Sequence, residues 1–454
     1  MRRILLFLIL FFSTNCFSQS YISRKNALAD IDFYVKTMIE SHYQPFMFIE
    51  RDKYFSNLSK IKKGIQDSID TKNLVRIFYQ ITSLLNDGHS TPSLSQPLFK
   101  EDYKKEQFLP VEFVTENAKL YSTVKTATQC KIPLGAEITA INNKDIPALL
   151  TQIQRGIAGN KPFSEVMSVK LLSYFLFLEE VKPPFRIQYK KANGKIESSV
   201  IEKGVDFRTA LAVTMPHISK RYEYKVLGHK LAYIDFRSMG GNIDDFKIFL
   251  DSCFADFKKK NISSLAIDIR KNSGGNTIFG DLLLSYLTDK PYSWGIKKWK
   301  VSQPYKDNLK ANGDTTSSYL GKANGTILTD PEHCDPQKNT FKNGDLFNGK
   351  VYLLTGPFTF SSAMAFADVV KTYKIASVIG EPTGENTQDF GEAFTFELPN
   401  SKIRIQSTSS FNLGADCNKK SNSPVIPDIN VTTTLSDKIH ERDKLIDYLM
   451  KEIR

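Results

Sequence analysis

Two adjacent serines stand where the chain could carry out nucleophilic chemistry. The pair Ser361-Ser362 follows an apolar run at 351–354 that predicts a strand, and it precedes a helical apolar pattern at 363–370. At a helix N-terminus, unpaired amides and the positive end of the helix dipole favour a developing negative charge. Serine is also a favoured N-cap residue. The pair therefore predicts either a nucleophile with oxyanion donors beside it or a plain helix cap.

A glycine pair follows another predicted strand. The segment 268–275 ends in Gly274-Gly275, after a buried apolar run at 265–269 and before a helical pattern at 278–287. Paired glycines let the backbone approach a ligand closely. The spacing is not Gly-x-Gly-x-x-Gly and no Gly-Lys-Ser follows, which disfavours nucleotide binding. The alternative is a tight strand-to-helix turn.

A histidine closes a helical pattern near the N-terminus. His89 is one of six histidines and follows Asp87-Gly88, directly after apolar helical spacing at 74–85. A histidine exposed at a helix end can act as a general base, or it can be a surface or capping residue. The sequence holds no Cys-x-x-Cys and no cluster with metal-ligand spacing. We therefore expect neither a metal nor a cofactor.

These motifs must be positioned by the surrounding elements. Residues 19–97 predict an N-terminal helical domain that carries His89. Residues 98–205 read as short strands, including 109–113 and 185–189, with a helix at 149–157. From 206 to 454, strands alternate with helices around a long polar insertion at 297–345. This alternation predicts a layered α/β core.

The segment 134–146 is the clearest feature of the second region. Its alternating apolar residues lead through Asn142-Asn143-Lys144 into a second short strand. This order resembles a PDZ domain, which binds an extended peptide by strand addition. A purely structural β domain is the alternative.

The N-terminus predicts export. Arg2 and Arg3 precede a short apolar stretch at 4–12, and small residues come before Gln19. This is typical of a signal peptide at 1–18, with delivery to the periplasm or outside the cell. A membrane anchor and lipidation at Cys16 are the alternatives, and no further membrane span is expected.

Composition adds two expectations. The net charge is +12, but the lysines are scattered, which indicates a solvated surface and not a nucleic-acid site. Cys334 and Cys417 lie in loop-like surroundings and could pair in an oxidising compartment.

Taken in order, the motifs resemble the tail-specific or C-terminal processing family of serine peptidases, which includes the tricorn core protease. The segments 378–384, 397–399 and 425–429 match the downstream signatures of that family. The resemblance covers most of the mature chain. It implies an α/β fold with a layered ββα core of the crotonase/ClpP-like type, preceded by the helical and PDZ-like regions.

The resemblance also implies site roles. Ser361 aligns with the nucleophile, and the amides of Ser362, Gly274 and Gly275 would form the oxyanion hole. One branch uses a lysine base shortly after the segment 378–384, but 384–388 contains none. The tricorn-like branch uses a histidine, which His89 matches.

The acid that orients this histidine has no clear match. No glutamate stands just before Pro427-Asp428, and Asp416 is the nearest acid upstream. The implied activity is that of a secreted or periplasmic serine endopeptidase acting on polypeptides, with no metal. The alternative is a weakly active or inactive peptide-binding relative, and the oligomeric state is left open.

Overall fold

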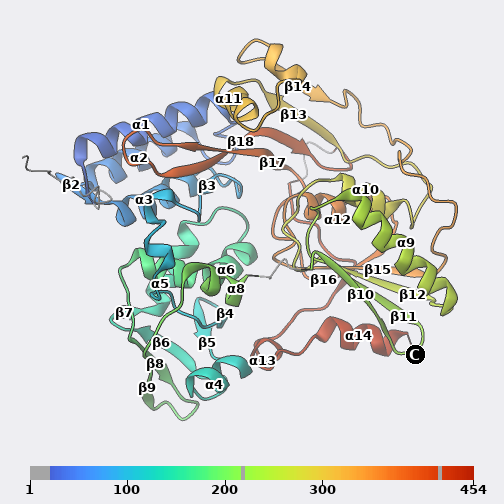
Figure 1. The fold of residues 1–454 in the computed structure, drawn as a ribbon, viewed down its shortest axis with the longest axis horizontal. Helices are drawn as coiled ribbons and strands as arrows, with labels where there is room; N and C mark the ends of the chain where they lie inside the picture. Colours follow the sequence, from blue (N-terminus) through green and yellow to red (C-terminus); the bar gives the residue numbers. More distant parts are fainter. Residues whose placement is uncertain (1–20, 216–219, 418–421, 454) are drawn as a thin grey trace, which may run out of the picture.

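The computed structural model describes residues 21–215, 220–417 and 422–453 (Figure 1). The predicted signal peptide at 1–18 lies outside these residues. In the ranges described, no helix is both long and apolar enough to cross a bilayer.

Three helices form the N-terminal region, and two of them begin with a side-chain cap. They are α1 (Arg24–Ser41), α2 (Arg51–Gly64) and α3 (Thr71–Ser83), and the short strands β1 (Tyr21–Ser23) and β2 (Ser68–Asp70) pair beside them. Ser23 caps α1 by accepting from an amide, and Asp70 accepts two amide bonds at the start of α3. These caps satisfy amides that have no intrahelical partner. The predicted helical pattern at 74–85 is confirmed as α3.

A five-strand antiparallel path follows, in the order β4-β5-β6-β8-β9, with β7 paired to β6. The strands are β4 (Val114–Glu116), β5 (Lys119–Tyr121), β6 (Glu137–Ile141), β7 (Lys144–Asp145), β8 (Phe185–Lys190) and β9 (Ile196–Ile201). The helices are α4 (Val124–Cys130), α5 (Ile146–Arg155), α6 (Lys161–Lys170), α7 (Leu172–Leu178) and α8 (Phe207–Thr214).

The predicted strand at 185–189 is confirmed as β8, whereas the predicted strand at 109–113 is wrong. Leu109, Val111 and Phe113 are buried in alternation, as a strand would require. Pro110, however, has no amide hydrogen to donate to a neighbour. Regular pairing therefore begins only at Val114.

The helices and the antiparallel sheet share one hydrophobic core. Tyr34 and Phe78 from the helices join Phe108, Leu150 and Phe185 from the sheet region in a single buried cluster. The hydrophobic core is therefore continuous across residue 97, where the expected N-terminal helical domain ends.

A second sheet runs β10-β11-β12-β15-β16-β19, and all neighbouring pairs except β10–β11 are parallel. The strands are β10 (Tyr222–Leu227), β11 (Leu231–Phe236), β12 (Ser264–Asp268), β15 (Lys350–Thr355), β16 (Ser377–Gly380) and β19 (Ile429–Asn430). Helices α9 (Ile243–Lys259), α10 (Ile278–Leu284) and α12 (Ser362–Thr372) pack on one face, and α14 (Lys444–Glu452) packs on the other, after the short α13 (Leu435–Ile439). The predicted layered α/β fold is confirmed. Because β12 and β15 are parallel neighbours, the turns that follow them open at the same sheet edge.

A third sheet, β14-β13-β18-β17, joins the core to the N-terminal region (Figure 1). Its strands are β13 (Ile296–Lys300), β14 (Ile327–Asp330), β17 (Asp389–Glu397) and β18 (Arg404–Leu413), with α11 (Gln303–Ala311) between β13 and β14. Strand β3 (Thr91–Pro92) pairs with β18, and buried Asp30 of α1 accepts bonds from the amides of Asn400 and Ser401 in the hairpin turn. The segment just after His89 is thereby fixed to the core.

The insertion at 297–345 is tied down by a disulfide. Cys334 and Cys417 are bonded, with their Cα atoms 6.2 Å apart. The pairing that the sequence left open is present in the structure.

Candidate active site

Ser361 lies on a tight turn between β15 and α12. Its backbone has φ 54° and ψ −132°, a region that residues with side chains rarely adopt. The Thr359 hydroxyl donates to the Ile269 carbonyl at 2.9 Å, and the Phe360 amide donates to the Asn272 carbonyl at 3.1 Å, which holds the turn. Although Ser361 occupies the N-cap position, its hydroxyl makes no capping bond. A plain helix cap therefore does not describe this serine.

The paired glycines pack against this turn. Gly274 has φ +102° and Gly275 has φ +139°. A Cβ on Gly274 would lie 2.8 Å from the Cβ of Ser361, and one on Gly275 would lie 2.1 Å from the Met239 carbonyl oxygen, so only glycine fits at either position. The Gly274 amide donates to Asn272 Oδ1 at 2.9 Å. The Gly275 amide has no acceptor among the described residues.

Ser362 connects the two turns. Its hydroxyl donates to the Gly275 carbonyl at 2.5 Å. Its amide is the first of α12 and belongs to the amides that a helix leaves without an internal partner. The amides of Ser362 and Gly275 are therefore two open donors on the turns that meet at Ser361.

His89 reaches the serine from the turn after α3. Its Nε2 lies 3.0 Å from Ser361 Oγ, which is within reach for proton transfer. The His89 ring packs on Phe360, with centroids 4.9 Å apart. A Cβ on Gly88 would lie 2.6 Å from the Phe360 ring. The glycine before the histidine thus permits this close approach.

Glu385 contacts both partners of the pair. One carboxylate oxygen lies 3.3 Å from His89 Nδ1, and the other accepts the Ser361 amide at 2.7 Å. Glu385 is buried and comes from the segment between β16 and β17. That segment is anchored by the Gly384 amide, which donates to the Thr359 carbonyl at 3.0 Å. The same carboxylate thus contacts both the histidine ring and the serine backbone.

Asp87 anchors the histidine loop from behind. It accepts the His89 amide at 2.8 Å, the Ser90 hydroxyl at 2.5 Å and the Thr408 hydroxyl at 2.9 Å. Buried His42 places its Nε2 3.3 Å from the same carboxylate. The Asp87 carboxylate also lies 4.0 Å from His89 Nδ1. It therefore fixes the loop backbone while adding negative charge beside the ring.

This surrounding charge changes the titration of the site. Burial alone would lower the pKa of His89, but the charge and hydrogen bond of Glu385, with the charges of Asp87 and Asp389, raise it to about 9. Burial opposes ionisation of Asp87, yet neighbouring His42 and His89 hold its pKa below the usual value. Burial, then the charge of Glu385, raises the pKa of Asp389 well above its usual value. At neutral pH the imidazole is thus held in its protonated form.

Of the predicted residues, the structure brings together Ser361, His89, Ser362 and the glycine pair, but it places Asp416 elsewhere. Burial raises the pKa of Asp368 in α12, and the charge of Asp416 adds to that rise. The ion pairs of His89 Nδ1 are with Glu385 and Asp87.

Sequence reasoning missed both of these carboxylates. The signal for Asp87 was its place two residues before His89, and the signal for Glu385 was its place directly after the 378–384 signature. The buried Asp389 beside them gave no signal of its own.

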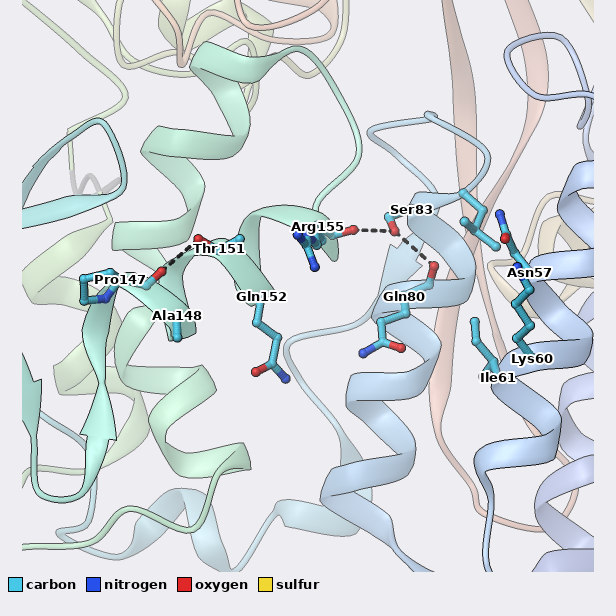
Figure 2. Close-up of a pocket in the computed structure, with 11 residues that line it drawn as sticks. Asn57, Lys60, Ile61, Gln80, Ser83, Pro147, Ala148, Thr151, Gln152 and Arg155 are labelled. Atoms are coloured by element: carbon cyan, nitrogen blue, oxygen red, sulfur yellow. Dashed lines mark hydrogen bonds between the residues drawn. The ribbon is translucent and has the colours of Figure 1, made fainter.

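A separate cleft of about 890 Å³ lies between the N-terminal helices and α5 (Figure 2). Two of its lining residues bridge these helices, since the Ser83 hydroxyl of α3 donates to the Arg155 carbonyl of α5 at 2.7 Å. None of the predicted site residues lines this cleft.

Comparisons with known proteins bear on the family and the fold of the chain. Residues 230–431 match the profile of peptidase family S41. No curated protein sequence matches the chain. Mature CPAF superposes with a TM-score of 0.64 at 16% identity, covering 94% of this chain and 96% of CPAF. CPAF complexed with lactacystin gives the same TM-score and identity, with 94% and 97% covered.

A third structure is more distant. The photosystem II D1 C-terminal processing protease gives a TM-score of 0.43 at 11% identity, covering 89% of this chain and 92% of that protein. The two CPAF comparisons show that the fold extends over nearly the whole chain.

Proposed function

We propose that this chain, whose residues 230–431 match the profile of peptidase family S41, is a serine endopeptidase whose nucleophile is Ser361 and whose general base is His89. The observation that carries this proposal is the continuous contact from Glu385 through His89 to Ser361. Its two distances are 3.3 Å to Nδ1 and 3.0 Å from Nε2 to Oγ. A nucleophile, a base and a group that orients the base are the parts that acyl transfer requires.

The proposed reaction has two halves. In the first, Ser361 Oγ attacks the carbonyl carbon of the scissile peptide bond while His89 Nε2 accepts the hydroxyl proton. The tetrahedral intermediate collapses as His89 returns that proton to the leaving amine, and the C–N bond breaks. In the second half, water replaces the amine and attacks the acyl carbon while His89 takes its proton; His89 then returns that proton to Ser361 Oγ as the acyl–oxygen bond breaks, which releases the acid and restores the serine.

The oxyanion is proposed to lie between the amides of Ser362 and Gly275. Both are open donors on the turns that meet at Ser361. Preorganised amides stabilise the charge that develops on the carbonyl oxygen. Gly274, which the sequence also suggested as a donor, has its amide bonded to Asn272. Its proposed role is to let the glycine turn pack closely against Ser361.

Glu385 is proposed to orient His89, in the place that the sequence analysis gave to Asp416. A carboxylate beside Nδ1 holds the proton on that nitrogen and leaves Nε2 free to act as a base. Glu385 also accepts the Ser361 amide, so it fixes both reacting groups with one side chain.

The substrate and compartment follow from the other regions. We assign polypeptide binding partly to the PDZ-like region at 98–205, where an extended chain would add to a sheet edge. Export through the signal peptide at 1–18 to the periplasm or outside the cell agrees with the Cys334–Cys417 disulfide, since such bonds persist in oxidising compartments.

The test is covalent labelling with a serine-directed fluorophosphonate, alongside turnover of a peptide library. The folded wild-type protein should be labelled and should cleave internal peptide bonds, and Ser361→Ala should do neither. A folded wild-type protein that resists labelling would support the alternative, a peptide-binding relative without catalysis.

A further inference from the structure

The loop carrying His89 and the segment from Glu385 to β17 bring three ligand-type side chains together. One ligand atom from each of His89, Glu385 and Asp389 lies within 4.8 Å of the other two. Glu385 and Asp389 are buried, and His89 is mostly buried. No spacing in the sequence joins these residues, since the histidine is almost three hundred residues from the two acids.

One distance in the cluster matches a tetrahedral metal site, and Asp389, within 4.8 Å of the other two ligands, would move closer to complete it. Zinc binds imidazole nitrogen and carboxylate oxygen at about 2.0–2.2 Å, and adjacent ligands of such a tetrahedron are then about 3.3–3.5 Å apart. His89 Nδ1 and the nearer Glu385 oxygen are 3.3 Å apart. In the metal-free protein Nδ1 faces the Glu385 carboxylate, and an ion bound between them would replace the proton on Nδ1.

The charge balance also favours a cation. The carboxylates of Asp87, Glu385 and Asp389 are all buried around the His89 ring, and His42 pairs with Asp87 alone. Buried like charges must be neutralised by protons or by a bound ion.

A small cavity provides room for the ion and its water. A space of about 140 Å³ is lined by Asp87, Glu385 and Asp389, and it adjoins His89 through the neighbouring Gly88 without being lined by the imidazole. Each liquid water occupies about 30 Å³, so an ion and a few waters fit. Asn86, Asn160 and Gln388 also line the cavity and bring amide groups to its wall.

We propose that His89 Nδ1, Glu385 and Asp389 form an inhibitory site for a divalent transition metal ion of the zinc type, with water as the fourth ligand. Metal on Nδ1 leaves the remaining imidazole proton on Nε2. That nitrogen then donates toward Ser361 and cannot accept its proton. The same ion occupies the carboxylate that orients the ring, so binding and proton transfer exclude each other.

The test titrates ZnCl₂ into untagged Ser361→Ala protein by isothermal calorimetry, so that binding is measured without turnover. We expect one ion per chain. Asp389→Asn should weaken binding by about tenfold or more, and His89→Ala should abolish it. Asp345→Asn, an exposed carboxylate paired with Lys258, is the matched control and should bind as the parent does. Equal affinity with and without Asp389 or His89 would overturn the proposal.

The inhibitory consequence rests on the proposed function and has its own measurement. ZnCl₂ should inhibit peptide cleavage reversibly, and a chelator should restore the activity. When each protein's rate is expressed relative to its own metal-free rate, Asp389→Asn should need a higher zinc concentration for half-inhibition. Equal inhibition of the parent protein and of Asp389→Asn by zinc would overturn the inhibitory role. A protein that cleaves no peptide yet binds one zinc through these residues would overturn the peptidase proposal and leave the metal site standing.

Discussion

The two halves of the candidate site are built in different ways. The serine half comes from two turns after neighbouring parallel strands, β12 and β15, within one sheet. The histidine half is brought from a position 272 residues away and is fixed by Asp87 and by the pairing of β3 with β18. The first half follows from local topology, whereas the second depends on how the N-terminal region docks on the core.

Ser361→Ala should have the largest effect on this arrangement. It removes the nucleophile from the locally built half, and we expect kcat/KM to fall by about 10⁴-fold to 10⁶-fold. Steady-state peptide turnover, with folding checked by circular dichroism, measures this. Ser362→Ala is the matched control because it keeps the amide and loses only a hydroxyl, so it should retain most activity. Equal losses for both serines would contradict the assignment.

His89→Ala tests the histidine half, which the N-terminal region brings to the core. If the base acts with the serine as one unit, the loss should approach that of Ser361→Ala, and the double variant should lose little more. The measurement is turnover by both single variants and the double variant. A folded His89→Ala with wild-type turnover would show that the histidine half takes no part in the chemistry.

Glu385→Gln should act on the coupling between the halves. Since only neutral imidazole accepts the proton and the pKa of His89 is raised to about 9, wild-type kcat/KM should rise with pH up to about that value. Removing the charge should lower that pKa, move the rise to lower pH and reduce the plateau by about 10²-fold to 10⁴-fold. Asp416→Asn is the control, and it should leave the pH profile in place. A shift with Asp416→Asn and none with Glu385→Gln would reverse the assignment of the acid.

Asp87→Asn should give the smallest of these effects on rate. It weakens the anchor of the histidine loop, so we expect about a tenfold loss in kcat/KM and a free energy of unfolding lower by about 1–3 kcal/mol. Urea unfolding and peptide turnover measure the two effects. Asp32→Asn, an exposed carboxylate paired with Lys62, should change neither. Unchanged stability and rate in Asp87→Asn would show that the loop needs no such anchor.

The two halves also differ in how far the sequence predicted them. The strand, glycine turn and serine helix were readable because apolar periodicity and turn residues are local signals. The motif identified His89 as a candidate base, but its 3.0 Å contact with Ser361 could not be predicted from the sequence. The strand expected at 109–113 failed because alternation alone does not supply a hydrogen-bonding neighbour.

The sequence by itself determined the layered α/β core, the turn that carries Ser361 and the glycine pair that lets the neighbouring turn pack closely against it. The tertiary structure decided which carboxylate faces His89, since Asp416 and Glu385 are equally acidic in the sequence and only packing makes one of them adjacent. It also decided that Asp389 joins the same cluster. Electrostatic interactions depend on distance in space and on burial, and neither is encoded by spacing along the chain when the partners lie on separate sheets and loops.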